Sequence, residues 1–500
     1  MKALVAESVG VFNSEGGSGW GGLGAVTGLA DYTRVKVKVW EFIDKFRGKG
    51  FSMGDARAYV SLLADLNIAR GERDYAEALY RAYEEALSLY RSKGLSALAE
   101  DYKAKVREWA TLDRSSFSVR PPPSRGPDLR PVVKGATVVS LFTGAYGLDL
   151  GFEMAGYDVV LGLDVSDASY ENFKANRPKT PFIHGDIAGY STAEILKEAG
   201  LRAGEVDVVT GGPPCQPFST AGKREGLKDY RSRALVEFIR FIKEARPKAF
   251  VMEEVTGILS SRLVHVPMKE RGGRPLRPEE RPGSLWEVVL GALRETGYRI
   301  TWGVLNAADF GAPQERERVI VVGVRSDIGV APTLPQPQYS RRPTATLKGV
   351  TLPWVTAAEA IMGVREDIGY ADLPPKYLKY IRYVPGGGNW RQIPDGLKPE
   401  AMNRAYATDG GKMGFYRRLA WFEPSPTLVT SPAMKATMLV HPWLDRPLGV
   451  REYMRLQGFP DEWKVVVGVQ EAYRLFGEAV PVPLAYAIAV HIGTLLGWVA

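Results

Sequence analysis

Apolar and polar residues alternate with two different periods along the chain, and the change of period divides it into two parts. Between about Asp31 and Leu112, apolar residues lie three and four positions apart, which predicts a set of amphipathic helices. Prolines at 121–123, 127 and 131 then end this pattern and predict an extended linker. From residue 136 onward, short β-branched runs such as Ala136-Thr-Val-Val-Ser-Leu-Phe142 alternate with glycine turns and helical stretches, which predicts strands of an α/β sheet.

Composition narrows the class of protein. The 500 residues are 45% apolar, which is typical of a folded globular chain of two or three domains. The 65 Lys and Arg exceed the 57 Asp and Glu and give a net charge of +8, which is compatible with a polyanionic partner without proving one. A single cysteine excludes an internal disulfide and favours a reducing compartment. The N-terminus lacks a long apolar stretch, so we expect a cytoplasmic protein.

The two ends of the chain differ in character. Residues 1–30 are rich in glycine and small residues and are expected to form a mobile arm. The run from Leu484 to Ala500 is apolar but covers only 17 residues and contains His491, whereas a membrane span needs about 20 apolar residues. We therefore expect a packed terminal helix and no membrane.

Candidate binding residues follow three successive predicted strands. The first strand runs into the turn Thr143-Gly-Ala-Tyr-Gly147 and a helix, the second ends in Asp164, and the third ends in Asp186. An acid about 20 residues after such a turn is placed to bind ribose hydroxyls, and strand ends of a parallel sheet meet at one edge. The pattern predicts a cofactor site at this edge. An ordinary strand–turn–helix, with acids that only cap helices, remains the alternative.

The only cysteine lies in Gly211-Gly-Pro-Pro-Cys-Gln-Pro-Phe-Ser219, directly after the predicted strand Val206–Thr210. Prolines stiffen the backbone around Cys215 and the glycines allow a sharp turn, so the motif suits a nucleophilic thiolate. A lone cysteine is otherwise more often a small buried apolar residue. Glu253 follows the predicted strand Ala249–Met252 and is expected to face the same edge.

The nine residues around Cys215 resemble, residue for residue, the nucleophile motif of the DNA (cytosine-5)-methyltransferase family. Further segments resemble the other motifs of this family in the same order. They are residues 138–155, Phe250-Val-Met-Glu-Glu-Val-Thr-Gly257, Gln314-Glu-Arg-Glu-Arg318, Pro424-Ser-Pro-Thr427, Arg451 through Pro460, and Gly477-Glu-Ala-Val-Pro481. The resemblance covers about residues 136–500 and leaves the N-terminal part outside.

The resemblance implies a Rossmann-like S-adenosylmethionine-dependent methyltransferase domain with a smaller, irregular target-recognition domain and an N-terminal helical domain. The expected boundaries are 1–130 for the N-terminal arm and helical domain, 131–330 for the catalytic domain, 331–415 for target recognition, and 416–500 for the C-terminal motifs. The last helix is expected to return to the catalytic domain.

The resemblance also implies roles for individual residues. Cys215 would attack carbon 6 of cytosine, Glu253 would supply a proton at ring nitrogen 3, and Arg318 would hold the exocyclic oxygen with Arg316 as its supporting neighbour. Contacts to S-adenosylmethionine would come from Phe142, Gly144, Gly147, Asp164, Val165, Asp186, Ile187, Pro214 and Val480. Contacts to DNA are expected from Gln216, Ser219, Lys223, Arg224, Arg231 and Arg391, and no metal is expected.

The target would be a cytosine flipped out of double-stranded DNA, since a base inside a duplex cannot be reached. A restriction endonuclease encoded nearby is an expected functional partner, without physical association, and the chain is expected to be a monomer. Three residues depart from the family pattern: Tyr146 replaces a glycine, and Glu254 and Glu478 each replace an asparagine. The extra negative charge would either tighten contact with a cationic sulfonium or weaken the site if unpaired.

Alternatives remain open. A tRNA methylase on the same scaffold would carry a second cysteine in a Cys-Phe-Thr signature, which is absent here. A DNA-binding protein that has lost catalysis would not need Cys215, Glu253, Arg316 and Arg318 together. For the N-terminal helices, a contact with DNA or a partner and a solvated appendage without such a role are both compatible with the sequence.

Overall fold

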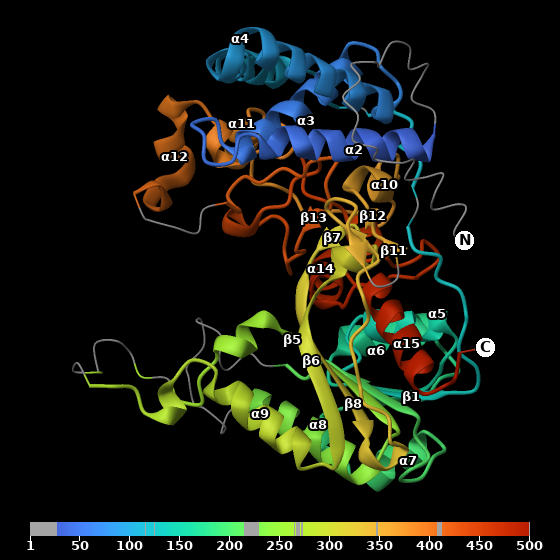
Figure 1. The fold of residues 1–500 in the computed structure, drawn as a ribbon. Helices are drawn as coiled ribbons and strands as arrows, with labels where there is room; N and C mark the ends of the chain where they lie inside the picture. Colours follow the sequence, from blue (N-terminus) through green and yellow to red (C-terminus); the bar gives the residue numbers. More distant parts are fainter. Residues whose placement is uncertain are drawn as a thin grey trace.

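The computed structural model describes residues 28–115, 117–124, 126–214, 230–264, 266, 271, 274–346, 349–407 and 413–499, with the side chains of 230–232 left out. Figure 1 shows three tiers: the N-terminal helices, a middle tier of short elements, and a twisted sheet with helices on both sides. The predicted N-terminal arm lies almost wholly outside the described residues.

The N-terminal part is helical, as predicted. It consists of α2 (Leu29–Asp44), α3 (Met53–Ala69) and α4 (Tyr75–Thr111). Ser52 and Asp55 form a reciprocal capping box at the start of α3, which satisfies backbone N–H groups that the first turn leaves free. Gly94 breaks the helical backbone of α4 with a φ of 78°, so α4 is two helices joined at a kink.

The sheet has seven strands in the order β3-β2-β1-β4-β5-β8-β6. The bounds are β1 (Thr137–Leu141), β2 (Asp158–Asp164), β3 (Phe182–His184), β4 (Val208–Gly211), β5 (Ala249–Val255), β6 (Tyr298–Asn306) and β8 (Glu317–Arg325). The first five in space are parallel, while β8 runs antiparallel to both β5 and β6. The predicted α/β fold is therefore confirmed.

Helices cover both faces of the sheet, and the apolar side chains of its strands are therefore buried in two layers. One face packs against α5 (Gly147–Ala155) and α15 (Val482–Leu495), and the other against α7 (Thr192–Glu198), α8 (Tyr230–Ala245) and α9 (Ser284–Arg294). A Cβ atom on Gly151 of α5 would lie 2.4 Å from the Cβ of Ala485, so α5 and α15 touch through their backbones. The C-terminal apolar run is thus a packed helix, as predicted, and most of its surface is buried.

Short elements make up the middle tier. They are β7 (Gln314–Glu315), β9 (Tyr339–Ser340), β10 (Ala345–Thr346), β11 (Gly349–Val350), β12 (Leu352–Pro353), α10 (Ala357–Ile361), α11 (Pro375–Ile381), α12 (Lys398–Met402) and β13 (Ser425–Pro426). Part of this tier has a small core of its own, while residues around 419–422 share a core with α2, α3 and α4. The four predicted domain boundaries stay predictions.

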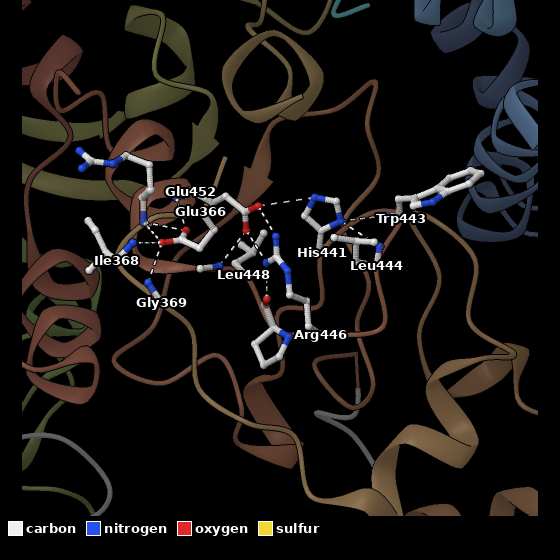
Figure 2. Close-up of polar contacts among 12 residues, drawn as sticks. Glu366, Ile368, Gly369, His441, Trp443, Leu444, Arg446, Leu448 and Glu452 are labelled. Atoms are coloured by element: carbon white, nitrogen blue, oxygen red, sulfur yellow. Dashed lines mark hydrogen bonds and ion pairs between the residues drawn. The ribbon is translucent and has the colours of Figure 1, made fainter. Parts of the chain in front are cut away.

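Two carboxylates, the buried Glu452 and the half-buried Glu366, join the middle tier to the C-terminal helices, and Figure 2 shows their contacts. Glu452 in α13 (Val450–Leu456) accepts hydrogen bonds from both terminal nitrogens of Arg446, at 2.9 and 2.7 Å, and lies 3.6 Å from Nε2 of His441. The backbone amides of Ile368, Gly369 and Arg451 donate to Glu366. These contacts hold α13 against the middle tier. Together with α13, the helices α6 (Asp167–Asn176) and α14 (Val469–Glu478) complete the set of helices around the sheet.

Candidate active site

The carboxyl ends of β1, β2, β3, β4 and β5 meet at one edge of the sheet because these strands are parallel. The amino end of β8 lies at the same edge, since β8 runs the other way and Arg318 pairs with Val255. The candidate residues Asp164, Asp186 and Glu253 therefore gather along one line, as the sequence predicted.

Glu253 and Arg318 form the charged centre of this edge. Nε of Arg318 lies 2.6 Å from Oε1 of Glu253, and both side chains are only 12% exposed. The antiparallel register explains the contact, because Glu253 and Arg318 project from the same face of adjacent strands. This arrangement brings together two of the four predicted catalytic residues and leaves the Glu253 carboxyl close to solvent-accessible space.

The predicted nucleophile motif approaches this pair through two glycines. A Cβ on Gly211 would lie 2.7 Å from the ring of Phe238 in α8, and a Cβ on Gly212 would lie 2.9 Å from Oε2 of Glu253. A side chain at Gly211 would therefore clash with the ring of Phe238, and one at Gly212 would displace the Glu253 carboxylate. The described chain continues to the exposed Pro214, and Cys215 itself lies outside the described residues.

Arg316 lies in a different environment from Arg318. It is buried, and its terminal nitrogens donate to the carbonyls of Leu428, at 3.1 Å, and Gly477, at 2.9 Å. Burial and, to a smaller extent, the nearby positive charge of Arg318 lower the pKa of Arg316 to about 9. Gln314 likewise donates to Gln457 at 2.9 Å. These two side chains hold the C-terminal segments against the sheet, so in this structure Arg316 contacts backbone rather than Glu253.

Asp164, the predicted ribose-binding acid, accepts hydrogen bonds from the backbone of the predicted cofactor turn and of the residues that follow Asp164. The Gly144 amide donates to Oδ2 of Asp164 at 2.8 Å, and the Ser166 amide donates to Oδ1 at the same distance. Phe142 has a φ of 58° in this turn. A Cβ on Gly147 would lie 2.3 Å from the carbonyl oxygen of Val480, so the C-terminal segment closes directly on the turn.

The remaining predicted cofactor residues line the same edge. Val165 exposes 67% of its surface, which is unusual for an apolar side chain directly after a buried strand. Asp186 is exposed and its Oδ1 accepts a hydrogen bond from the Ala188 amide at 2.9 Å, while Ile187 is buried. An exposed apolar side chain between two acids suits a ligand with a flat ring and hydroxyl groups.

Glu478, one of the departures from the family pattern, lies near this edge. Desolvation raises its pKa, and the negative charge of Asp164 raises it further against the opposing charges of Arg474 and Arg316. Two neighbouring carboxylates favour a cationic ligand, since a positive charge would relieve their repulsion.

Tyr146 adopts a left-handed backbone conformation, with a φ of 73°, which explains why a glycine suits this position. Its side chain compensates by extensive contacts. The hydroxyl donates to Oε1 of Glu153 at 2.5 Å, the ring stacks on Trp463 with centroids 5.6 Å apart, and the guanidinium of Arg177 lies 5.6 Å from the ring centre. The tyrosine is therefore built into the fold behind the cofactor turn.

Glu254 projects from β5 toward the opposite face from Glu253 and is 3% exposed. Its Oε1 has no hydrogen-bond partner among the described residues. Burial raises the pKa of Glu254 well above its usual range, and the negative charge of Glu253 adds to this rise. Burial thus favours the protonated form of Glu254, which is the form that adds no charge to the site.

Asp149 is a structurally important residue that the sequence did not indicate. It accepts hydrogen bonds from Ser140 in β1, at 2.6 Å, and from Thr210 in β4, at 2.8 Å, and so ties the start of α5 to two strands. Burial raises its pKa to about 6. An acid at the third position of a helix that begins with glycine could have indicated this role. The sequence does not show, however, that the hydroxyls of Ser140 and Thr210 on neighbouring strands are its partners.

Most of the predicted DNA contacts lie outside the described residues, namely Gln216, Ser219, Lys223 and Arg224. Arg231 lies in the first turn of α8, where side chains are not described. Arg391 is exposed in a short turn, Trp390–Gln392, of the middle tier. The described contacts therefore do not connect any of these six residues to the sheet edge that holds Glu253.

Comparison with known proteins matches this arrangement to one family. The family model for C-5 cytosine-specific DNA methylases matches residues 136–494, and so leaves out α2, α3 and α4. The chain is 37% identical over 364 residues to the type II methyltransferase M.PspPI of Psychrobacter sp. (strain TA137), which covers 72% of this chain and 79% of that protein. It is 33% identical over 354 residues to M.Sau96I of Staphylococcus aureus, covering 70% and 74%.

Among solved structures, a protein described as a DNA modification methyltransferase encoded within a prophage of E. coli superposes with a TM-score of 0.50. The match is 24% identical and covers 73% of this chain and all of that one. At this identity the likeness supports the fold alone.

Proposed function

The chain belongs to the C-5 cytosine-specific DNA methylase family and is a DNA cytosine-5 methyltransferase, and we propose that it modifies a flipped cytosine through a covalent adduct of Cys215. The observation that carries this proposal is the Glu253–Arg318 ion pair of 2.6 Å beside Gly212, three residues before Cys215. The described chain before Cys215 thus reaches the edge of the sheet that holds Glu253, which supports a shared role for the two residues.

Carbon 5 of cytosine is a poor nucleophile, so electron density must first enter the ring. The Cys215 thiolate forms a bond to carbon 6, and the electron pair of the 5,6 double bond moves toward carbon 5 while Glu253 gives a proton to nitrogen 3. Arg318 holds the Glu253 carboxyl in place through its ion pair and donates to the exocyclic oxygen of the base. Both groups act where negative charge develops, which is where electrostatic stabilisation accelerates a reaction.

Carbon 5 then forms its bond to a methyl group, which S-adenosylmethionine would supply when bound, leaving S-adenosylhomocysteine. The proton on carbon 5 leaves to water or hydroxide, its electron pair restores the 5,6 double bond, and the sulfur–carbon bond breaks so that Cys215 departs as a thiolate. Nitrogen 3 returns its proton to Glu253, which completes the cycle. The net change is one methyl group in place of one hydrogen.

The edge residues fit S-adenosylmethionine. Asp164 would bind ribose hydroxyls, the exposed Val165 offers an apolar surface for the adenine, and Asp186 and Ile187 would complete that pocket. The paired carboxylates of Asp164 and Glu478 would favour the positive sulfonium or ammonium group. No metal is required by this chemistry.

We further propose double-stranded DNA as the substrate, with the chain acting as a cytoplasmic monomer. The relatives named type II methyltransferases support pairing with a restriction endonuclease that reads the same site and does not bind the methyltransferase.

The first test is transfer of labelled methyl from S-adenosylmethionine to mixed-sequence duplex DNA by wild-type protein and by Cys215→Ser, with tRNA as the control substrate. We expect transfer to DNA that the variant abolishes, and bisulfite sequencing should map it to cytosines in one short context. Transfer to tRNA alone, or DNA binding without any transfer, would overturn the proposal.

A further inference from the structure

The N-terminal helices pack against the middle tier, and this contact is unusually well defined. Figure 1 shows α2, α3 and α4 stacked on the short elements of the middle tier, on the side away from the sheet. Aromatic rings meet across the boundary: the ring centroids of Trp109 and Trp443 lie 5.5 Å apart, and those of Tyr75 and Trp421 lie 6.3 Å apart. A solvated appendage would not share an aromatic core with its neighbour.

Buried ion pairs fix the geometry of this boundary. Nζ of Lys36 lies 2.9 Å from Glu359, with the two side chains 6% and 3% exposed. Arg114 donates to both carboxylate oxygens of Asp445 at 2.9 Å. The Arg114 side chain is buried, while that of Asp445 is 34% exposed. A buried charge is stable only when its partner is correctly placed, so these pairs fix how the helices lie on the middle tier.

One helix, α3, lies directly behind a glycine loop, which we define as residues 385–392. A Cβ on Gly386 would lie 2.4 Å from Oγ of Ser61 and 3.1 Å from Oδ2 of Asp65. Gly387 has a φ of 73°, and its Cβ would lie 3.5 Å from Cγ of Arg57. The backbone of the loop therefore touches α3 with no room for a side chain between them.

The other end of the glycine loop is also tied to α3. Nε2 of Gln392 donates to Oδ1 of Asp55 at 3.4 Å, and the Asn389 amide donates to Oε1 of Gln392 at 2.8 Å. Oδ1 of Asn389 in turn accepts from the Arg391 amide at 3.0 Å. A chain of hydrogen bonds thus runs from α3 to the backbone of Arg391, an exposed arginine in the predicted target-recognition segment.

The contact is poorly suited to stabilising the fold. Both carboxyl oxygens of Asp65 and the Ser61 hydroxyl are buried without a hydrogen-bond partner among the described residues. Burial raises the pKa of Asp65 far above its usual range, although Arg418 and Arg114 oppose this. Apolar side chains at 61 and 65 would pack more favourably. We therefore infer that the contact between Ser61, Asp65 and the backbone of the glycine loop serves to hold the loop in position, and not to stabilise the fold.

We propose that the N-terminal helices are part of the DNA-recognition unit, and that Ser61, Asp65 and Arg57 of α3 act as positioning residues for the glycine loop. This inference rests on the proposed function, since it assumes that the loop reads DNA. An arginine that reads a base must be held to within about 0.5 Å, because its discrimination between bases depends on the geometry of its hydrogen bonds. Displacing the loop should relax site specificity while leaving the chemistry at the sheet edge intact.

The test is Gly386→Ala in the full-length chain, with Gly396→Ala as a matched control because no atom lies within 4 Å of a Cβ at Gly396. The measured quantities are kcat and KM on DNA carrying the mapped site and on DNA with one base pair changed. For Gly386→Ala we expect the ratio of kcat/KM values between these substrates to fall about tenfold, with kcat at saturating DNA and S-adenosylmethionine affinity unchanged. The control should behave as wild type.

A second variant keeps the proposal testable if Gly386→Ala folds poorly. Ser61→Ala removes the oxygen that the new methyl group would strike, so Ser61→Ala/Gly386→Ala should recover part of the lost discrimination. Ser61→Ala alone removes one of the three side-chain contacts behind the loop and should lower discrimination, but by less than Gly386→Ala does. Unaltered discrimination in a folded Gly386→Ala protein would overturn the proposal, as would an equal loss of kcat and cofactor binding. Wild-type protein that transfers no methyl group would instead overturn the proposed function.

Discussion

The sheet edge and the boundary between the N-terminal helices and the middle tier both place charged side chains in nearly dry surroundings, but by different means. At the edge, Glu253 and Arg318 lie on adjacent strands, and their contact follows from strand register. At the boundary, Lys36 and Glu359 are 323 residues apart in sequence and meet only through tertiary packing. The first arrangement is local to one sheet, and the second joins distant parts of the chain.

This difference separates two functions of buried charge. The edge pair leaves the Glu253 carboxyl within reach of a substrate, so its charge can take part in chemistry. The boundary pair is enclosed on all sides and can only fix geometry. We therefore expect changes to the Glu253–Arg318 pair to alter rate with little effect on folding, and changes at the boundary to alter stability and specificity first.

The largest effect is expected for Glu253→Gln. The amide keeps the shape of the side chain but cannot give a proton to the base, so kcat should fall about 10²–10⁴-fold. Single-turnover methyl transfer at saturating DNA and S-adenosylmethionine measures this, with the exposed Glu317→Gln at the same edge as the control. A variant with unchanged kcat would show that Glu253 is not the proton donor.

Breaking the boundary pair should instead affect the free energy of unfolding. Lys36→Met leaves Glu359 buried without its cation and should cost about 3–5 kcal/mol in denaturant unfolding. Lys103→Met is the control, because the Lys103–Glu100 pair has side chains 63% and 73% exposed and should leave stability nearly unchanged. Equal effects of the two variants would mean that the boundary pair is not enclosed as described.

The sheet edge was largely predictable from sequence because strand ends follow from local patterns. β-branched runs marked β1, β2 and β5, and the residue after each strand had to lie at the common edge. Asp164, Asp186 and Glu253 could therefore be placed together before any contact was known. The resemblance around Cys215 added chemistry to this placement, although Cys215 itself lies outside the described residues.

The rest depends on contacts between segments far apart in sequence. The resemblance gave Arg318 and Arg316 different roles, but the Gln314–Arg318 motif does not indicate that Arg316 is buried against the carbonyls of Leu428 and Gly477. Likewise, the periodicity of α3 indicates a helix but does not indicate that a glycine loop more than 300 residues later lies against it. Packing partners of this kind follow from tertiary structure alone.

A smaller effect that depends on pH is expected for Glu254→Gln. Because burial raises the pKa of Glu254 in the folded state, the native protein holds a proton that the unfolded chain releases, and stability falls as pH rises from the usual glutamate range through the raised pKa. The fall is at most about 1.4 kcal/mol per pH unit. The Gln variant lacks this titration, so its stability relative to wild type should grow with pH.

Denaturant unfolding of both proteins between about pH 5 and 9 measures this difference. Glu254→Asn, which restores the residue typical of the family, should follow the Gln variant in its pH dependence. Parallel curves for wild type and Glu254→Gln would mean that Glu254 is already charged in the folded protein.

The smallest effect is expected for Tyr146→Phe, which lies at the edge but behind the chemistry. The variant keeps the ring on Trp463 and removes only the hydroxyl that donates to Glu153, and Arg177 still donates to Glu153 through Nε at 3.0 Å. The lost bond should lower the free energy of unfolding by about 1 kcal/mol. Since Tyr146 supports the cofactor turn from behind, kcat and S-adenosylmethionine affinity should stay near wild type. A large loss of cofactor affinity with unchanged stability would instead place the tyrosine hydroxyl in the binding site. The cofactor site would then include a residue that cannot be predicted from its position at the end of a strand.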